Sequence, residues 1–544
     1  MLRVIRHRLK PVLLLLLSLP AVAAQKFDVV VYGGTAGGVI AAVSAAREGL
    51  KTALIEPGHH LGGMVSGGLS DTDYGKKEVI GGYALEFYAR VAQHYQLSRY
   101  GVPVAWYHEP HVAENIFRQM LREAHVTVFE NHRLREKNGV RKEGAKLLEI
   151  ELDNGDTFAA DIFMDSSYEG DLMAQAGISY TYGREGAAQY DESLAGVRGK
   201  TPYHQFLVNI SPYDDQHRLL PEISSEKLLP PGSPDKKVQS YNFRMCLSEV
   251  PENMIPFPKP EGYDPHRYEL LARLIAARTQ TEGKVPSIGT FLKIDPIPNG
   301  KADINNNGAF STDYIGGSYD YPEGDYRTRA RVWKAHRDYQ AGLFYFLAND
   351  PKVPEVLRNQ VNHWGLAKDE FVDTDHWPNQ LYIREARRMI GDYVVIQKDL
   401  QTELVKPDVI GMGSYNSDSH NLQRIVDADG FVRNEGDMQV ATKPYQIPYR
   451  VMLPKRTEAG NLLVPVCFSA SHVAYSSLRM EPQYMIIGQA AGVAAKLAIA
   501  NRKAVQEIDT AALSARLKKQ GAVFEYVPTP QISGAGLVHR TTAP

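Results

Sequence analysis

The sequence predicts an α/β fold built on a parallel sheet, and three features near its start support this prediction. An apolar, β-branched run at 27–32 has the composition of a buried strand, and the glycine-rich turn 33–38 follows it directly. An alanine-rich segment then extends to Arg47 as an expected helix, and a second strand is expected at 51–55, with Glu56 at its end. Strand, tight turn, helix and strand in this order form the βαβ unit of a Rossmann-type dinucleotide-binding domain.

The turn and the acidic residue indicate where a dinucleotide would bind. Glycines permit the tight turn, and the helix N-terminus offers free N–H groups and a partial positive charge to a pyrophosphate. Glu56 stands 23 residues after Gly33, where the acid that binds ribose hydroxyls is expected. Thr35 occupies the position of the second glycine of the fingerprint, so its side chain crowds the pyrophosphate. Its hydroxyl is able to donate a hydrogen bond to phosphate instead.

The surroundings of this unit favour a flavin over a nicotinamide dinucleotide. A second glycine-rich stretch at 57–68 suits a flavin ring, which needs backbone approach beyond the adenosine half. A meander is expected downstream, with strands at 146–152 and 157–164 joined by an Asn-Gly turn, and the segment 165–171 then returns to the cofactor. A nicotinamide enzyme would usually continue with further βα repeats.

The C-terminal part of the chain supplies a second approach to the cofactor. A strand expected at 462–467 enters the segment 468–472, and an apolar helix opens at 479–482 and runs to about residue 500. Glu481 at the cap and Pro482 at the first helical position fit a helix start. The N-terminus of this helix would stabilise negative charge on a reduced flavin ring.

Seven motifs follow one another in an order that is typical of one family. They are YGGTAGG, HHLGGMVSGGL, DSSYEGDLMA, YIREARRMIGDYV, GSYNSDSH, IPYRVMLPK and SASHVAYSSLRMEP. Over roughly 27–500 the chain resembles the FAD-dependent oxidoreductase family of secreted bacterial flavoproteins, some of which carry the label "xanthan lyase". Its layout is more distantly similar to succinate dehydrogenase and fumarate reductase flavoproteins. The resemblance implies FAD as the cofactor and a GR2-like, Rossmann-type FAD-binding domain with an inserted α+β substrate domain.

The resemblance also implies domain limits and cofactor contacts. A signal peptide is expected at 1–24, the two parts of the FAD-binding domain at 25–190 and 401–544, and the inserted domain at 191–400. The second part of the FAD-binding domain would carry C-terminal helices and a tail. The implied FAD contacts are Gly33, Gly34, Thr35, Ala36, Gly37, Gly38, Glu56, Gly62, Gly63, Met64, Ser471, Met480 and Gly488.

The first 24 residues have the layout of a secretory signal peptide. Four basic residues precede an apolar run at 12–19, then Pro20 and a stretch of small residues that ends at Ala24. A membrane anchor is the alternative, but a membrane span requires about 20 apolar residues, and the apolar run at 12–19 is shorter. We therefore expect export, cleavage after Ala24 and a periplasmic or secreted protein. Cleavage removes four positive charges and no negative ones, so the formal charge becomes −6 instead of −2.

The middle of the chain, at about 190–400, is the expected substrate side. Its many aromatic residues form either the core of a loop-rich domain or a platform for a polyhydroxylated ligand. Arg384 and Arg388 are expected on one face of a helix, where they are either salt-bridged or free to bind an anion. The run that starts at Asp303 begins like a calcium loop, but its twelfth position is Tyr314, so a turn that caps the backbone is expected instead.

Catalysis requires proton transfer and electrostatic support beside the flavin, which itself carries the hydride. His472 is the first candidate base, because it follows the strand that re-enters the cofactor site and titrates near neutrality. A buried structural histidine is the alternative. Asp418 and His420 form a second candidate pair, since a carboxylate can orient an imidazole. Arg479 and Arg450 are candidates for polarising a substrate oxygen or stabilising the flavin anion.

The route of the electrons follows from two features of the sequence. No second strand–turn–helix unit occurs after the first, and Cys246 and Cys467 lie far apart, so neither an NAD(P)H domain nor an iron–sulfur cluster is expected. Electrons are expected to pass to or from a diffusible partner, which is oxygen, a quinone or a cytochrome. Covalent FAD attachment at His59 or His60 stays open, and no metal site is expected.

Together these features predict an exported FAD-dependent oxidoreductase. Its expected substrate is small and polar, with carbohydrates and other hydroxylated compounds as candidates, and is oxidised by hydride transfer to flavin. A flavin-dependent reductase of unsaturated acids is the first alternative, in which the arginines take the substrate and proton roles. A flavin- or polysaccharide-binding protein without turnover is the second. The near-neutral charge gives no basic excess for nucleic acid, and no membrane span is expected after cleavage.

Overall fold

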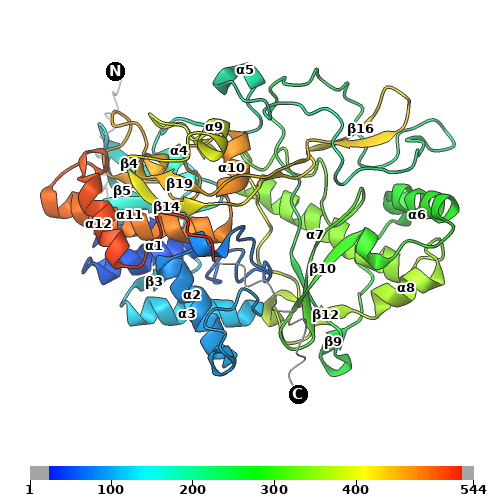
Figure 1. Cartoon of the computed structure of the whole chain (residues 1–544), viewed down its shortest axis with the longest axis horizontal. Coiled ribbons are helices and arrows are strands. Elements are labelled where there is room, and N and C mark those ends of the chain that lie inside the picture. Colours follow the sequence, from blue (N-terminus) through cyan, green and yellow to red (C-terminus); the bar gives the residue numbers. More distant parts are fainter. Residues whose placement is uncertain (1–23, 530–544) are drawn as a thin grey trace, which may run out of the picture.

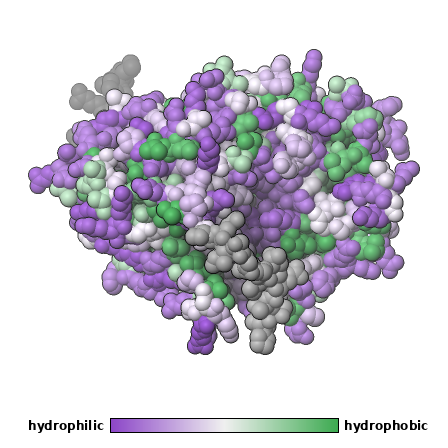
Figure 2. Space-filling view, viewed as in Figure 1, coloured by the Kyte–Doolittle hydropathy of each residue, from purple (hydrophilic) through white to green (hydrophobic). Residues whose placement is uncertain are grey.

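A computed structural model describes residues 24–529 of the chain (Figure 1). The predicted signal peptide therefore lies outside the described residues, apart from Ala24. In Figure 1 the blue and the orange-to-red segments lie together on the left, and the green middle of the chain forms the right-hand side. Figure 2 shows this face covered mainly by hydrophilic side chains, with smaller hydrophobic areas between them. Over residues 24–529, no helix has the length and the apolar character that crossing a membrane requires.

A seven-stranded sheet organises the left-hand side. Its strand order is β3-β2-β1-β6-β5-β4, and β20 pairs with the end of β6. The pairs β1–β2, β1–β6, β2–β3 and β6–β20 are parallel, whereas β4–β5 and β5–β6 are antiparallel. β5 and β6 form the expected meander. The strands are β1 (Gln25–Tyr32), β2 (Thr52–Ile55), β3 (Thr127–Phe129), β4 (Val140–Glu143), β5 (Lys146–Glu151), β6 (Thr157–Asp165) and β20 (Leu462–Leu463).

The carboxyl ends of three neighbouring strands align at one edge of this sheet. Tyr32, the last residue of β1, pairs with Ile55 of β2 on one side and with Asp165 of β6 on the other. Gly33 and Glu56, which follow these strands, therefore leave the sheet at the same edge, where open α/β sheets bind their ligands. The predicted Rossmann-type α/β fold is confirmed.

Two helices from opposite ends of the chain pack closely beside this sheet. A Cβ on Gly488 of α11 would lie 2.2 Å from the carbonyl oxygen of Gly37 in α1, so the two backbones touch. Nearly all of α11 is buried, as expected of a helix that is apolar on every side. It begins at Glu481 with Met480 as its N-cap, one residue earlier than Pro482 predicts. The helices on this side are α1 (Ala36–Arg47), α2 (Gly82–His94), α3 (Pro110–Glu123), α10 (His472–Leu478), α11 (Glu481–Asn501) and α12 (Thr510–Lys519).

A five-stranded sheet and three helices form the right-hand side. The strand order is β10-β11-β8-β12-β9, and all of its pairs are antiparallel. Asp303 lies within β11, so the expected capping turn is wrong for residues 303–306, which belong to an interior strand of the sheet. The elements are β8 (Met245–Ser248), β9 (Met254–Ile255), β10 (Leu292–Ile297), β11 (Lys301–Asn306), β12 (Gly365–Ala367), α6 (Glu269–Glu282), α7 (Tyr326–Asn349) and α8 (Glu355–Asn362).

The segments between the two sides form short strand pairs and helices. Residues 384–388 were expected on a helix, but residues 381–387 form neither helix nor strand and lead into β13. Every side chain of 381–389 is buried, which a helix with one solvated face would not allow. The remaining elements are α4 (Asp171–Gln175), α5 (Ala187–Tyr190), α9 (Gln397–Gln401) and the pairs β7 (Tyr180–Thr181) with β13 (Arg388–Met389), β14 (Val409–Gly413) with β19 (Tyr445–Pro448), β15 (Ser417–Ser419) with β18 (Met438–Val440), and β16 (Gln423–Val426) with β17 (Val432–Glu435).

Candidate active site

The glycine turn after β1 is shaped by a close backbone contact. Gly33 has φ +98°, and a Cβ there would lie 2.6 Å from the amide nitrogen of Ser167, so glycine is required on both counts. Glu56 at the end of β2 accepts hydrogen bonds from the amides of Gly34 and Gly58, each at 2.7 Å. These bonds hold the acid against the turn, while burial raises the pKa of Glu56 to about 7 despite them.

Thr35 orders the start of α1 instead of pointing its hydroxyl at a phosphate. As the N-cap of α1 it accepts from the amide of Gly38 at 3.1 Å, and it donates to the carbonyl of Ser166 at 2.8 Å. The first amides of the helix, at Ala36 and Gly37, have no carbonyl within the helix to bond. The glycine turn therefore keeps an anion-binding helix N-terminus even though threonine replaces its second glycine.

A cavity of about 470 Å³ opens directly above this turn. It runs from the ends of β1 and β2 to the beginning of α7 and to the segment before Leu381, and it brings together the three segments that the sequence predicts around a dinucleotide. Its lining includes Gly33, Thr35, Glu56, Gly58, Tyr168 and Gln380. The ribose acid, the open helix N-terminus and the cavity fit the adenosine and pyrophosphate half of FAD.

A second group of residues that fits a flavin lies where the 62–69 loop meets the start of α11. The amide of Met64 donates to the hydroxyl of Tyr168 at 2.9 Å, and that hydroxyl donates to Glu481 Oε1 at 2.7 Å. Within the described part of the chain, Glu481 Oε2 and both amide atoms of Gln483 are buried without a hydrogen-bond partner. Native interiors seldom leave such groups unpaired, so these atoms fit the polar edge of a bound group such as the flavin ring. Burial raises the pKa of Glu481 to about 8.

Other residues that the resemblance assigns to FAD have structural contacts here. A Cβ on Gly63 would lie 2.4 Å from the Tyr168 hydroxyl, and one on Gly62 would lie 2.5 Å from Phe117. Gly488 permits the contact between α1 and α11. Ser471 caps α10 and donates to Glu192 at 2.6 Å. The direct FAD contacts of these residues stay predictions.

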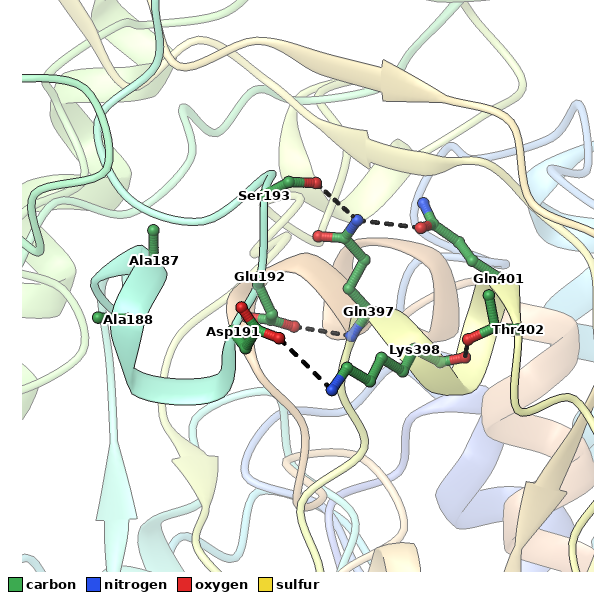
Figure 3. A pocket seen from close by; sticks show the side chains of 9 residues that line it. All are labelled: Ala187, Ala188, Asp191, Glu192, Ser193, Gln397, Lys398, Gln401 and Thr402. Carbon is green, nitrogen blue, oxygen red and sulfur yellow. Dashed lines mark hydrogen bonds and ion pairs between the residues drawn. The ribbon is translucent and has the colours of Figure 1, made fainter.

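A second hollow, of about 440 Å³, lies between α5 and α9 (Figure 3). Its polar groups bond one another: Glu192 accepts from the amide of Gln397 at 2.7 Å, and Lys398 lies 3.6 Å from Asp191. The hollow is lined by neither the glycine turn nor the catalytic candidates, so we place the active site elsewhere.

Two of the predicted catalytic residues, Arg479 and Asp418, meet between the two sides of the molecule. Arg479 Nη2 donates to the backbone carbonyl of Asp418 at 2.8 Å and lies 3.9 Å from its carboxylate. Arg479 Nη1 donates to the hydroxyl of Tyr382 at 3.0 Å. Because Arg479 immediately precedes the cap of α11, this group of residues lies beside the candidate flavin site.

Three buried arginines in this region each have an aspartate partner. Arg244 binds Asp303 through two hydrogen bonds of 2.6 and 2.8 Å, and Arg384 lies 3.0 Å from Asp313. The third pair is Arg479 with Asp418. We call these six residues the arginine–aspartate cluster. The guanidinium of Arg384 also lies 4.7 Å from the ring centre of Tyr382, which connects two of the pairs.

Sequence reasoning missed three members of this cluster, Arg244, Asp303 and Asp313, and also Tyr382. It named Arg384 as salt-bridged or anion-binding but placed it on a helix, whereas the segment forms neither helix nor strand. Asp303 was read as part of a turn, and nothing in the local sequence marks Arg244 or Asp313. Their pairing depends on the five-stranded sheet and on contacts between distant segments.

His420 pairs with a different carboxylate from the one expected. Its Nδ1 lies 2.7 Å from Asp313 Oδ2, so Asp313, rather than Asp418, orients the imidazole. Burial and the charge of Arg384 lower the pKa of His420 despite this carboxylate. His420 is therefore neutral near pH 7, with Nε2 as the acceptor when Nδ1–H bonds Asp313.

His472 lies in a separate buried network at the start of α10. Its Nδ1 is 2.8 Å from Glu385, its Nε2 is 3.2 Å from Ser419, and its amide donates to Glu185 at 2.9 Å. Arg388 is ion-paired with both Glu385 and Glu185. Although burial opposes them, His472 and Arg388 lower the pKa of Glu385 to about 2. Both ring nitrogens of His472 thus have partners, which favours its structural alternative.

The remaining candidates do not join the cluster. Arg450 lies 3.7 Å from Asp408 and 4.0 Å from the ring centre of Tyr393, and its side chain is 38% exposed. Cys246 and Cys467 are buried, free thiols that belong to different core clusters. The possible catalytic role of Arg450 stays a prediction.

Comparison with known proteins identifies the family. The sequence profile described as FAD dependent oxidoreductase matches residues 28–517. No curated protein matches the chain. Among solved structures, a geranylgeranyl bacteriochlorophyll reductase-like protein from Thermoplasma acidophilum has 11% identity over 91% of this chain and 83% of that chain, with a TM-score of 0.33.

Other similar structures share a smaller part of the chain. OxyS anhydrotetracycline hydroxylase from Streptomyces rimosus has 14% identity over 30% of this chain and 36% of its own, with a TM-score of 0.22. Glycine oxidase from Geobacillus kaustophilus has 14% identity over 30% of this chain and 61% of its own, with a TM-score of 0.21. The chain thus spans about a third of the hydroxylase and less than two thirds of the oxidase. From the profile match, which extends over most of its length, the chain belongs to the FAD dependent oxidoreductase family and is a flavoenzyme with FAD as its cofactor.

Proposed function

We propose that this oxidoreductase oxidises a small, uncharged polar substrate, such as a sugar or another hydroxylated compound, beside the arginine–aspartate cluster. The charge balance of the cluster carries this proposal. Arg244, Arg384 and Arg479 are each paired with an aspartate, so the site has no excess of positive charge for an anionic substrate.

Further acidic groups strengthen this argument. Asp73 accepts from the hydroxyl of Tyr415 at 3.0 Å and lies 4.0 Å from Arg244, and Asp437 lies close enough for the charge of Asp418 to act on it. Burial raises the pKa of Asp437 to about 7, with a further contribution from Asp418. A reductase of unsaturated acids would need arginines free to bind the substrate carboxylate, so this balance disfavours that alternative.

The residues of the chain have separable roles in the proposed reaction. Bound FAD supplies the two-electron chemistry that accepts a hydride. His420, held by Asp313, takes the substrate hydroxyl proton on Nε2. Burial raises the pKa of Tyr382 although Arg479 and Arg384 oppose it, so its phenol stays protonated and donates a hydrogen bond to a substrate oxygen. Asp418 fixes the position of Arg479 beside the start of α11.

FAD would be held along two segments of the chain. The glycine turn 33–38 and Glu56 would bind the pyrophosphate and the ribose, and Met64, Glu481 and Gln483 would surround the flavin ring. A diffusible acceptor, which is oxygen, a quinone or a cytochrome, would receive the electrons from bound FAD.

We also propose the domain limits given above, with an FAD-binding domain of 25–190 and 401–544 around an inserted domain of 191–400. The pairing of β20 with β6 supports them, because a C-terminal strand completes the N-terminal sheet. We propose export as well, which rests on the signal-peptide layout of residues 1–24. Fractionation of cells that produce the full chain tests export, and retention of an uncleaved protein in the cytoplasm would overturn it.

Anaerobic mixing tests the proposed reaction. The holoenzyme is mixed with neutral sugars and polyols, with amines, and with unsaturated acids, and the flavin absorbance near about 450 nm is followed. We expect bleaching by a neutral hydroxylated compound. Bleaching by none of them, together with reoxidation of the reduced enzyme by an unsaturated acid, would support the reductase instead.

A further inference from the structure

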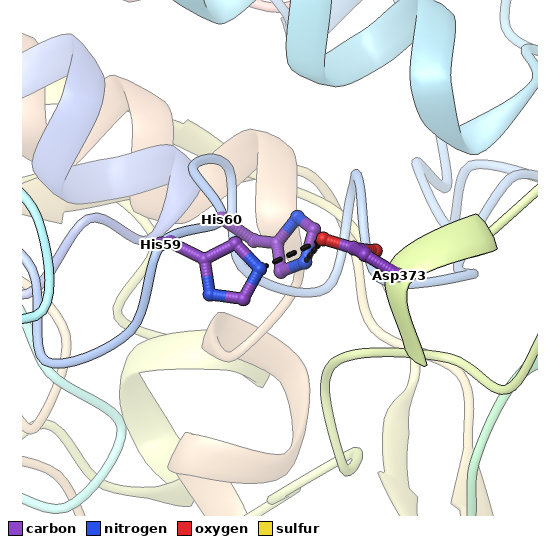
Figure 4. A group of neighbouring side chains, drawn as sticks. All are labelled: His59, His60 and Asp373. Atoms are coloured by element: carbon purple, nitrogen blue, oxygen red, sulfur yellow. Dashed lines mark hydrogen bonds and ion pairs between the residues drawn. The ribbon is translucent and has the colours of Figure 1, made fainter. Parts of the chain in front are cut away.

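Two adjacent histidines and an aspartate converge just after Gly58, which lines the cavity above the glycine turn (Figure 4). Nε2 of His59 lies 2.8 Å from Asp373 Oδ2, and Nε2 of His60 lies 3.2 Å from the same oxygen. The three potential ligand atoms all lie within 4.8 Å of one another. In a tetrahedral zinc site, ligand atoms are separated by roughly 3.4 Å. The side chains therefore have nearly the separation that a zinc ion requires.

The contact between His60 and Asp373 does not have the geometry of a hydrogen bond. Although the two atoms are 3.2 Å apart, Nε2 of His60 is buried and has no hydrogen-bond partner among the described residues. Two ligands of one metal ion lie close together in the same way, because both are directed at the ion and do not bond each other. In Figure 4 both imidazoles point toward Asp373.

The other ring nitrogen of His60 is held by a carboxylate. Nδ1 lies 3.0 Å from Glu114 Oε2, and Glu114 is in turn bound by Arg118 at 2.7 Å. Histidine ligands of metals usually donate their second N–H to a carboxylate in this way, which fixes the tautomer with Nε2 free to bind. Arg118 also donates to the backbone carbonyl of His59 at 2.6 Å and so orders the loop that carries both histidines.

A second histidine–carboxylate group of the described residues differs from the first in its charge balance. Glu109, His111 and Glu370 also bring potential ligand atoms within 4.8 Å of one another. There the buried ammonium of Lys301 bonds Glu109 and Glu370, each at 2.7 Å, and already supplies the positive charge. No lysine or arginine pairs with Asp373 among the described residues.

We propose that His59, His60 and Asp373 bind a divalent transition-metal ion of the Zn²⁺ type, with water in the fourth position. The ligands are Nε2 of both histidines and Oδ2 of Asp373, a set of imidazole and carboxylate donors that zinc accepts. His59 and Asp373 are about half exposed, so an ion and its water reach the site from solvent.

The position of the ion gives it a mechanical role. His59 follows Gly58, whose amide bonds Glu56, while Asp373 belongs to the short 3₁₀ helix η6 (Val372–Thr374) of the inserted segment. Bound zinc therefore fastens the loop that follows the ribose-binding acid to the other side of the molecule.

Zinc binding to the full-length holoenzyme tests the proposal. The protein is treated with EDTA, dialysed against zinc chloride and analysed for bound metal, and its melting temperature is recorded with and without zinc. We expect one equivalent of zinc and a higher melting temperature. His59→Ala, His60→Ala and Asp373→Ala should each abolish both effects, and Glu114→Gln should weaken binding by about tenfold, because Glu114 only orients a ligand.

His363→Ala is the matched control, because it removes an exposed histidine that pairs with Glu249 at 3.0 Å without a second histidine nearby. This variant should bind zinc like the unaltered protein. The proposal is overturned if the holoenzyme binds no zinc, or if Asp373→Ala and the histidine variants retain the same stoichiometry and melting-temperature shift. Retention by folded Glu114→Gln of full affinity would remove the orienting role of Glu114.

Discussion

The carboxyl edge of the parallel sheet and the arginine–aspartate cluster differ in how their residues are brought together. At the sheet edge, one βαβ unit supplies the turn and the acid, and the bond from Gly34 to Glu56 spans 22 residues. In the cluster, Arg244 and Asp303 are 59 residues apart, and Arg479 and Tyr382 are 97 residues apart. The turn and the acid at the sheet edge are thus encoded locally, whereas the substrate side exists only when distant segments fold onto one another.

This comparison predicts the largest effect at the glycine turn. Gly33→Ala places a Cβ 2.6 Å from the Ser167 amide at a residue with φ +98°, so the backbone must shift at the FAD cavity. We expect a loss of about 3–5 kcal/mol from crowding and the left-handed conformation, together with loss of bound FAD. Denaturant unfolding and the flavin content of the purified protein measure both effects.

Gly49→Ala is the control for this substitution. Gly49 also has positive φ, at +79°, but an added Cβ would meet nothing within 4 Å. It should cost only about 1 kcal/mol and should retain FAD. Equal effects of the two variants would show that backbone conformation alone, and not the close approach to Ser167, makes Gly33 necessary.

The second prediction concerns the cluster and is nearly as large. Asp303→Asn removes the charge that pairs most closely with the buried Arg244 and leaves only Asp73, 4.0 Å away. Breaking a buried ion pair by removing one partner costs about 3–5 kcal/mol. We expect that decrease in the free energy of unfolding. Asp338→Asn, which breaks an exposed pair with Lys334, should cost less than about 1 kcal/mol. If both variants lose the same stability, the cluster is not a buried electrostatic unit.

The third prediction distinguishes the two candidate bases. His420→Asn should slow flavin reduction by the substrate by about 10²-fold, because it removes the proton acceptor while the FAD cavity stays intact. His472→Asn should instead lower the melting temperature, because Glu385 loses a buried partner. Stopped-flow absorbance and thermal unfolding separate these effects. A large kinetic defect in His472→Asn alone would identify His472 as the base.

The sequence was sufficient for the βαβ unit at the sheet edge because the information there is periodic and local. The strands around β1, the helix α1, the meander and the acid Glu56 all occur where the sequence predicts them. The substrate side was not predictable in the same way. Residues 381–387 contain apolar and charged residues compatible with a helix, and only the burial of every side chain, with an aspartate for Arg384, favours the irregular form. Similarly, the sequence does not predict Asp313 as the partner of His420, because 107 residues separate them.

The fourth prediction uses the raised pKa of Glu481, which lies where the two regions meet. Burial favours the neutral carboxyl, so its contribution to stability is present below pH 4.5 and is lost as the pH rises toward about 8. Glu481→Gln removes this titration. In FAD-free protein, the stability of this variant relative to the unaltered chain should rise by at most about 1.4 kcal/mol per pH unit between these limits. A constant difference between pH 5 and pH 8 would contradict the burial of an ionisable Glu481.

The smallest effect is expected at Thr35, where the sequence departs from the glycine fingerprint. Thr35→Ala removes the N-cap of α1 and the bond to Ser166, and the loss of such a cap costs about 1 kcal/mol. Thr35→Ser keeps a hydroxyl able to make both bonds and should be nearly unchanged in stability and in FAD affinity. Thr35→Gly should lose only a few tenths of a kcal/mol, because glycine is tolerated at an N-cap. If Thr35→Ser instead binds FAD much more weakly, the threonine methyl group itself contacts the cofactor. Capping of α1 would then not be sufficient to explain why threonine stands at this position.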